Sequence, residues 1–264
     1  MSSTAPKPLV DCGRGPGGMD EVEWQLRVQT AAAYRLIHRN GWNELIWGHT
    51  TTRLPGAEHQ FLINPYGLRY DEVTASSLVV IDLDGNIVEP GAHAVNPAGF
   101  VIHSAIHRHR ERARCVMHTH SRAGMAVASM RCGLLPISMS AISFHGHLAY
   151  HDFEGSTLLL EEREKLAADV GDARAVIMRN HGLLAIGATV PEAFLHLFRL
   201  EQACKVQVDA MSSGAELIEP PFEVIERSVI QTEEFARCAA DGIGELEFAA
   251  FMRLLDAEEP SYRT

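Results

Sequence analysis

Two histidines separated by one residue carry the clearest chemical signal in the sequence. His118 and His120 close a short apolar run, and side chains two apart in a strand project from the same face. A third histidine, His181, follows a second apolar run. Three imidazoles meeting at strand ends can hold a divalent cation with one coordination position left open, as catalytic metals require. Zinc, iron, manganese and cobalt all accept such ligands. Ordinary strand and turn histidines share this spacing, so both interpretations stay open.

A pair of histidines four residues apart offers a competing metal site. His103 and His107 fall on a predicted helix at a spacing that zinc sites use. They share a helix face with Arg110 and Glu111, however, and we interpret that face as solvated.

A second pair with one intervening residue follows later in the chain. His145 and His147 stand in the segment 143–155, with His151 nearby. Gly146 between the two makes a regular strand less secure. The stretch is therefore either part of the wall around a substrate or a plain surface loop.

The histidines need a sheet whose strand ends meet, and the sequence predicts such a sheet. Asp84-Gly85 is a hairpin turn signal between apolar runs. The runs typical of strands cover residues 44–54, 59–64, 77–83, 113–120 and 174–180.

Helical periodicity accounts for most of the remaining chain. One amphipathic pattern opens near Asp20 and ends at Asn40-Gly41, where glycine tolerates the left-handed cap. Thr189, with Glu192 three residues later, forms a capping box for a helix to about Met211. Further helices are predicted to begin near Asn96-Pro97 and to cover residues 121–130, 156–170 and 244–255. One α/β domain with a central mixed sheet covered by helices is the economical architecture.

Composition narrows the class of protein. The 264 residues, 46% of them hydrophobic, can build one large core. The net charge of −11 makes nucleic acid and anionic membranes poor partners, so we predict neither. No run approaches the ~20 apolar residues of a spanning helix, and the N-terminus lacks the apolar segment of a secretory signal. Five scattered cysteines suit a reducing compartment, and we expect a cytoplasmic protein.

Five ordered motifs resemble one known family. Residues 22–211 contain VNPAGFVIHSAIH, CVMHTH, GLLPIS, AYHDF and RNHGLLAIG in the order and spacing of the class II aldolase/adducin superfamily, most similar to its adducin-like branch. The resemblance implies a single αβα sandwich on a central mixed β-sheet, assembled into a homotetramer. It also implies one divalent metal ion per subunit, bound by His118, His120 and His181. We divide the chain into a flexible arm over 1–19, a metal-binding domain over 20–211 and a C-terminal helical extension over 212–264.

Two departures from the family pattern bear on the substrate. The Ser-Ser-Glu segment of the family's aldolases, which binds phosphate and transfers protons, falls on Pro97, Ala98 and Gly99. The family's Gly-Asn phosphate motif becomes Gly48-His49. A sugar-phosphate aldolase is therefore disfavoured, whereas a free helix N-terminus and a guanidinium suit a carboxylate. The predicted substrate-binding residues are His49, Arg53, Asn96 and Gly99.

The leading hypothesis is a metal-dependent lyase. It would decarboxylate, or cleave by a retro-aldol reaction, a small non-phosphorylated hydroxy- or oxo-carboxylic acid through a metal-stabilised enediolate. His145, Tyr150 or a metal-bound water would replace the missing acid/base carboxylate. Residues after Met211 are expected to reach a neighbouring subunit's site.

Two other functions stay open. The same three histidines could hold Fe(II) and activate oxygen, as the resemblance implies for a few superfamily proteins. Adducins use this domain as the non-catalytic head of a cytoskeletal protein, and the loss of a carboxylate at Gly99 fits that role. The three metal histidines and the absence of a long basic tail favour an enzyme.

Overall fold

The computed structural model describes residues 19–264 except 57–58, 89–92, 96, 156–161 and 239. The predicted arm over 1–19 therefore lies almost wholly outside the described residues. Within the described part, seven strands form one sheet in the order β3-β2-β1-β4-β7-β6-β5. Neighbouring strands are antiparallel except for β5 and β6, which are parallel. The strands are β1 His49–Arg53, β2 Phe61–Ile63, β3 Val79–Ile81, β4 Cys115–Thr119, β5 Leu148–His151, β6 Ala175–Met178 and β7 Gly182–Gly187.

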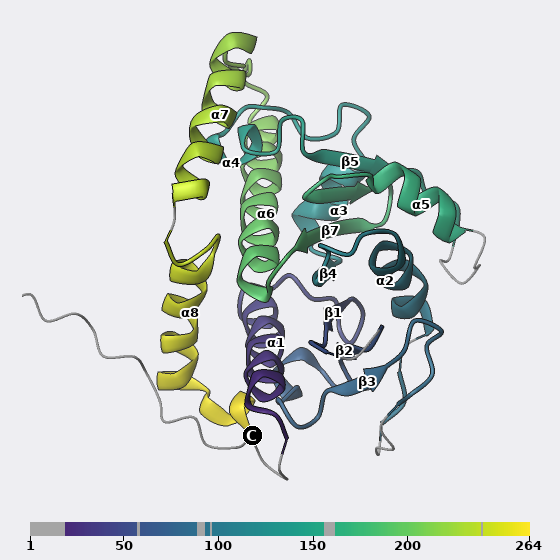
Figure 1. Cartoon of the computed structure of the whole chain (residues 1–264). Helices are drawn as coiled ribbons and strands as arrows, with labels where there is room; N and C mark the ends of the chain where they lie inside the picture. The colour runs from purple at the N-terminus through teal and green to yellow at the C-terminus, as the bar shows by residue number, and fades with distance from the viewer. Residues whose placement is uncertain (1–18, 57–58, 89–92, 96, 156–161, 239) are drawn as a thin grey trace, which may run out of the picture.

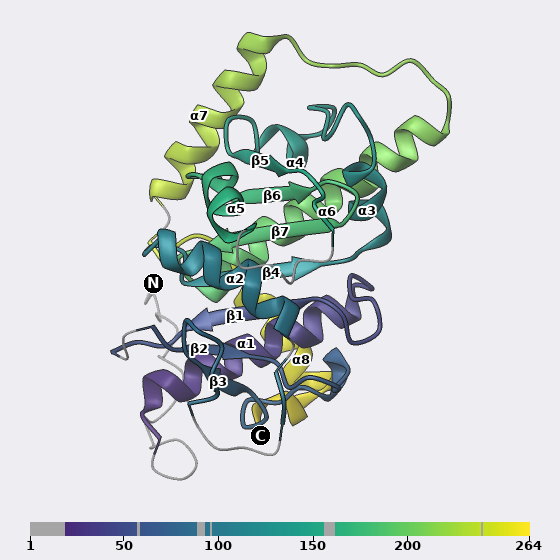
Figure 2. The ribbon, with the colours of Figure 1, turned by 90° about the vertical axis from the view of Figure 1, so that its right-hand side faces the viewer.

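Helices cover both faces of this mixed sheet (Figures 1 and 2). α2 and α5 lie on one face, α1, α3 and α6 on the other, and α8 packs outside α6 and α1. The fold class is thus the predicted αβα sandwich. The helices are α1 Glu21–Arg39, α2 Pro97–His109, α3 Arg122–Ala128, α4 Met139–Ile142, α5 Glu162–Val170, α6 Val190–Ser212, α7 Phe222–Cys238 and α8 Glu245–Glu258, with 3-10 turns η2 Tyr70–Glu72 and η3 Pro260–Arg263.

The period-two alternation of the central strands sets which side chains face which layer. In β4, Cys115 and Met117 are buried against α1 and α6, whereas Val116 is buried with α2 and α5. His118 therefore projects toward α2 and α5, and Thr119 toward α6. The apolar residues on both sides of His118 fix its direction, because a slip of one residue would exchange the two faces.

Most predicted helix ends are correct. Asn40 caps α1, and Gly41 adopts φ 67°. The Thr189 hydroxyl accepts from the backbone N–H of Glu192 at 3.1 Å, as a capping box requires. The Glu192 carboxylate, however, accepts from Ala188 N–H at 2.6 Å, one residue before the expected Thr189.

Other predicted elements were too long, and some observed elements were not predicted. The strand predicted over 44–54 shrinks to β1 because Glu44 and Trp47 pair only with each other through a local bridge. The tail contains α7 in addition to the expected helix α8, and β5 forms where a loop was the alternative. Asn96 and the start of the helix predicted over 156–170 lie outside the described residues. Among the described helices, none combines the length and apolar content needed to cross a lipid bilayer.

Replacing Thr189 by alanine should destabilise the protein by about 1 kcal/mol, because a first-turn N–H of α6 loses its side-chain acceptor. Urea unfolding followed by circular dichroism measures the change. Thr189→Ser keeps the hydroxyl and should retain most of the stability. Equal losses in the two variants would contradict the capping role.

Candidate metal centre

Three histidines meet where β4 ends and β7 begins. β4 and β7 are antiparallel, with Thr119 opposite Leu183, so His120 and His181 flank the same end of the pair. Asn180 turns the chain between β6 and β7 with φ 55°, a left-handed conformation that asparagine tolerates. A side chain at Gly182 would collide with the Thr119 carbonyl oxygen. The close approach of the two backbones therefore requires glycine at this position.

The Nε2 atoms of these three residues, which we call the histidine triad, point at one another. The distances are 2.9 Å from His118 to His120, 3.3 Å from His118 to His181 and 3.0 Å from His120 to His181. Three nitrogens bound at about 2.1 Å around a tetrahedral zinc lie about 3.4 Å apart. The spacing of the triad is therefore close to that of a metal-ligand set.

The outer nitrogens of two triad rings fix the protonation of the inner ones. His118 Nδ1 donates to the Leu183 carbonyl at 2.9 Å, and His120 Nδ1 donates to Glu44 at 3.2 Å. In a neutral imidazole the other nitrogen then carries only a lone pair. Two such lone pairs at 2.9 Å cannot hydrogen-bond to each other, whereas a cation between them satisfies both. The residues present thus fit a divalent metal, and their outer contacts are those that orient metal-binding histidines.

Burial keeps the triad neutral at ordinary pH. It places the pKa of His118 well below its usual value, with the neighbouring histidines adding to the effect. It lowers the pKa of His181 to about 4, again assisted by His120. The pKa of His120 is also lowered by burial, although Glu44 opposes the shift. Neutral imidazoles with free lone pairs are the form that binds metal.

His49 lies beside the triad on the same face of the sheet. It is opposite His118 in the β1–β4 register, and their ring centroids are 5.2 Å apart. Its ring is buried, neither ring nitrogen has a hydrogen-bond partner, and burial lowers its pKa to about 3. A Cβ atom added at Gly99 would lie only 2.9 Å from this ring. His49 therefore occupies the room that the first turn of α2 leaves open, next to the candidate metal ligands.

The expectation that His103 and His107 form a solvated face was wrong. They are 1% and 2% exposed, because the face of α2 that carries them packs against β1. The Thr51 hydroxyl lies 2.6 Å from His103 Nδ1 and 2.7 Å from His107 Nε2, so it bridges the two rings. The His103 ring in turn lies 4.2 Å from that of His49. A buried row of imidazoles thus leads away from the triad.

The structure does not bring Arg53 to the triad. Arg53 ends β1 four residues beyond His49, about 13 Å along an extended strand. Its Nη2 donates to the His107 carbonyl at 2.6 Å, and its guanidinium lies 4.9 Å from the Phe61 ring centroid. Arg53 therefore faces a different part of the surface.

Neither predicted acid/base side chain reaches the triad. Tyr150 is packed with the α6-side core, opposite to His118, and its hydroxyl accepts from Leu134 N–H at 3.0 Å. His145 is exposed between α4 and β5, where its ring lies 5.5 Å from Phe222 of α7. Alternation along β5 sends Tyr150 to one face and His151 to the other.

His151, which the sequence placed in either a substrate wall or a surface loop, lies on the same side of the sheet as His118. Its side chain is buried, and Nδ1 donates to the Asp169 carboxylate of α5 at 2.7 Å. His151 and His181 line the same small cleft together with Phe153 and Arg179. The alternation of β5 could have shown that His151, rather than Tyr150, faces the His118 side.

A buried carboxyl group also escaped the sequence reasoning. Glu201 of α6 is fully buried and accepts from the Thr119 hydroxyl at 2.9 Å, and burial raises its pKa to about 7. Thr119 separates two triad histidines, so this bond holds the end of β4 in place. The sequence indication of this buried carboxyl group was a glutamate within the apolar pattern of α6.

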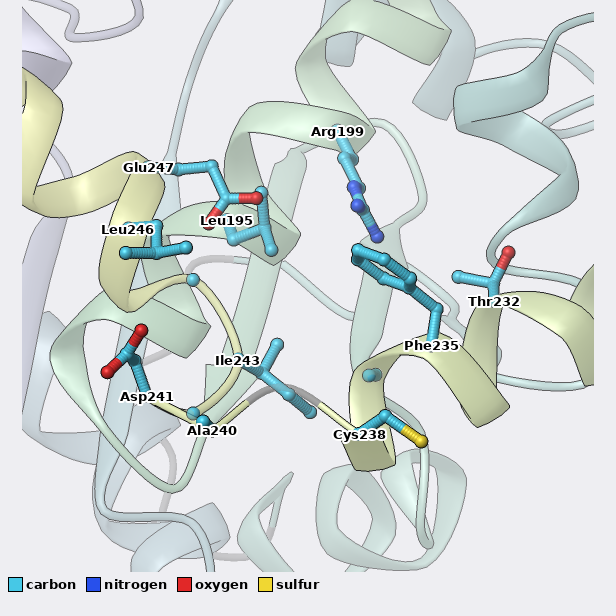
Figure 3. A pocket seen from close by; sticks show the side chains of 13 residues that line it. Leu195, Arg199, Thr232, Phe235, Cys238, Ala240, Asp241, Ile243, Leu246 and Glu247 are labelled. Atoms are coloured by element: carbon cyan, nitrogen blue, oxygen red, sulfur yellow. The ribbon is translucent and has the colours of Figure 1, made fainter. Parts of the chain in front are cut away.

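A separate cavity of ≈ 220 Å³ lies between α6, the end of α7 and the start of α8 (Figure 3). Apolar side chains including Phe235, Ile243 and Leu246 line much of it, and Arg199 points toward Phe235 in this view. Among the described residues, the histidine triad is the group of His, Cys, Asp or Glu side chains whose ligand atoms converge closely enough to hold a metal ion, and none of its members lines this cavity.

Comparison with known proteins matches the sequence to one family. The family described as Class II Aldolase and Adducin N-terminal domain matches residues 28–208. A Caulobacter vibrioides protein, named only provisionally as an aldolase class 2 protein, is 45% identical over 93% of this chain and 95% of its own. Rat alpha-adducin is 42% identical over 93% of this chain, which spans 34% of the adducin.

Solved structures show the same relationship. An aldolase II superfamily protein from Pseudomonas syringae has a TM-score of 0.85 and 46% identity, covering 92% of this chain and 96% of that one. An L-fuculose 1-phosphate aldolase from Glaciozyma antarctica has a TM-score of 0.81 and 26% identity, covering 98% and 97%.

Gly99→Ala should destabilise the protein by about 1–3 kcal/mol, because the new methyl group overlaps the His49 ring. In a His49→Ala background the same change should become neutral or stabilising, since alanine is the better helix former once the space is free. Urea unfolding of the four proteins in this double-mutant cycle measures the coupling. An unchanged cost in both backgrounds would contradict the packing of His49 on Gly99.

Proposed function

The chain belongs to the class II aldolase and adducin family, and on that premise we propose that it is a metal-dependent carbon–carbon lyase. Its substrate is a small hydroxy- or oxo-carboxylic acid without a phosphate group. The observation that carries the proposal is the convergence of three neutral imidazole nitrogens within 3.3 Å of one another. Bound there, a divalent cation would supply a Lewis acid for a carbonyl or hydroxyl oxygen of the substrate.

His49 and the first turn of α2 bind the substrate carboxylate in this proposal. The ring nitrogens of His49 are buried without a partner, a costly condition that a ligand would relieve. The backbone N–H groups near Gly99 open a 13-residue helix and favour an anion. Asn96, which lies outside the described residues, is assigned to the same subsite from its place in the sequence.

Two departures argue against a sugar phosphate as the substrate. Gly99 offers no carboxylate for proton transfer, and the His49 ring fills the adjacent space. The Glaciozyma protein is named for L-fuculose 1-phosphate, but the family's phosphate-binding hydroxyls are replaced here at Pro97 and Ala98.

His151 takes the role of proton donor and acceptor. Asp169 accepts from its Nδ1 and so leaves the lone pair on Nε2, the nitrogen free to exchange a proton. The cleft that it shares with His181 adjoins the triad. In a retro-aldol cleavage, Nε2 would accept the proton of the substrate hydroxyl as the C–C bond breaks and return it to the carbanion that remains. After a decarboxylation, Nε2 would pass a solvent proton to the carbanion.

We further propose a homotetramer in the cytoplasm. Several apolar side chains of the C-terminal segment are exposed, and α7 buries only Ile225 among its described side chains. An amphipathic helix whose apolar side chains are exposed to this extent is typical of a subunit contact. The exposed side chains are Ile218, Phe222, Val224, Ile230, Phe235, Ile243 and Leu246.

The protein purified without chelator should contain about one equivalent of zinc, iron, manganese or cobalt per chain, and His118→Ala should lose most of it. Mass spectrometry of the elements measures both, with His109→Ala as a matched exposed control. The metal-loaded protein should convert members of a panel of hydroxy- and oxo-acids without oxygen, followed by NMR of the products.

Two outcomes would contradict this proposal and indicate a different function. Conversion that strictly requires oxygen would indicate an Fe(II) oxygenase. No conversion, with His118→Ala altering only assembly, would indicate a non-catalytic role like that of the adducin domain, which the 42% identity to alpha-adducin supports equally.

His151→Gln should lower turnover by about 10²- to 10⁴-fold while metal content stays unchanged, because the variant retains volume but cannot exchange the proton. Asp169→Asn should have a smaller effect in the same direction, since it disturbs only the ring's orientation. Solvent deuterium incorporation into the product and elemental analysis are measured together, with Asp209→Asn as an exposed control. Parallel losses of metal and of thermal stability would identify a structural role instead.

A further inference from the structure

The end of the β1–β4 pair remote from the triad carries a concentration of positive charge. The eight residues 107–114 contain four arginines in a chain whose net charge is −11. They join the end of α2 to the start of β4, and Arg53 closes β1 beside them. A cavity of ≈ 530 Å³ opens here, and we call it the basic cavity. Its lining residues are Arg53, Leu54, Pro55, Gly56, His59, His107, Arg108, Glu111 and Arg114.

Arg53 is held in a fixed direction at this cavity. One guanidinium nitrogen, Nη2, donates to the His107 carbonyl at 2.6 Å, and the Phe61 ring lies beneath the group at 4.9 Å. Its Nε is buried and has no hydrogen-bond partner. An arginine oriented by packing loses little further entropy when it binds a ligand, which favours recognition of an anion.

The positive charge in the cavity is poorly balanced. Arg53 and Arg114 form no ion pair with any carboxylate of the described residues, whereas Arg108 is 3.2 Å from Asp84. Burial lowers the pKa of Arg53 and the charge of Arg114 lowers it further, while Glu111 opposes the shift. Among the described residues that line the cavity, Glu111 is the one acidic residue. Two cations held near each other with a single acidic residue beside them are stabilised further when an anion lies between them.

We propose that the basic cavity binds a small polyanion, a phosphorylated or polycarboxylic metabolite, at a site distinct from the metal centre. Its volume falls within the range of small-ligand pockets. Planar guanidinium groups match phosphate and carboxylate oxygens in pairs. The strand length from Arg53 to His49, about 13 Å, keeps this ligand away from the triad. The inference does not depend on the proposed lyase activity.

The test is calorimetric titration of the purified full chain with pyrophosphate and, separately, with citrate. We expect saturable binding that weakens as salt rises. Arg114→Gln should weaken it about tenfold, because one charge-assisted contact is lost. Arg112→Gln is the matched control, since Arg112 is exposed on the same segment but does not line the cavity. Arg53→Lys, which keeps the charge but not the fork, should weaken binding by a similar factor.

A second series separates this site from the triad. In metal-free protein, His118→Ala should bind both probes as tightly as the unmodified chain. Preference for pyrophosphate or for citrate would identify the chemical class of the ligand. No binding at millimolar concentration, equal losses in Arg114→Gln and Arg112→Gln, or loss confined to His118→Ala would each overturn the proposal. A folded Arg114→Gln variant, verified by circular dichroism, excludes unfolding as the cause.

Discussion

Lone pairs directed at one point constrain the structure around the histidine triad. The outer nitrogens of His118 and His120 already donate to Leu183 and Glu44, so their inner nitrogens face each other without a proton to share. Such an arrangement persists only if the fold holds it against repulsion or a cation occupies it. The backbone of β7 takes part directly, because the acceptor for His118 is a β7 carbonyl. The chemistry of the centre therefore depends on the register of β4 and β7, which buried apolar side chains on both faces fix.

The row of polar side chains beneath α2 extends this constraint. His107 Nδ1 donates to the Ala113 carbonyl at 2.7 Å, so its Nε2 accepts from the Thr51 hydroxyl. Thr51 in turn accepts from His103 Nδ1, which leaves His103 Nε2 with a lone pair and no partner. One backbone carbonyl thus determines the tautomers along the whole row. The row ends beside His49, so the first turn of α2, β1 and the triad form one coupled unit.

The sequence predicted the parts of this unit that depend on local periodicity. His118 and His120 share an environment because a strand places them two apart, and the buried runs before them and before His181 were sufficient to locate the strand ends. The positions of His103 and Arg53 could not be predicted in the same way. His103 is buried because α2 lies across β1 with that face inward, and Arg53 is remote because the site forms at the other end of a five-residue strand. Both facts depend on which elements pack together.

Contacts with residues far away in the sequence explain the remaining differences between the predicted and the observed site. Tyr150 and His145 were reasonable proton donors by residue type. The Tyr150 hydroxyl, however, accepts from the backbone N–H of Leu134, and α7 lies beside His145. Asp169, which gives His151 its orientation, lies eighteen residues away on α5, and no spacing rule connects the two. Glu201 likewise reaches Thr119 across 82 residues. Contacts between distant segments of this kind are set by tertiary packing, which local patterns do not encode.

The unpaired ring nitrogens beside the histidine triad impose an energetic cost on the fold. Each buried ring nitrogen left without a partner at His49 and His103 costs about 1–3 kcal/mol. On the same helix, Ile102 and Ile106 fill the neighbouring core with apolar atoms and incur no such cost. Extending that apolar packing to His49 and His103 would remove the cost. Retention of unpaired, desolvated imidazoles around the triad fits a site that gives up stability to keep ligand-binding groups in place.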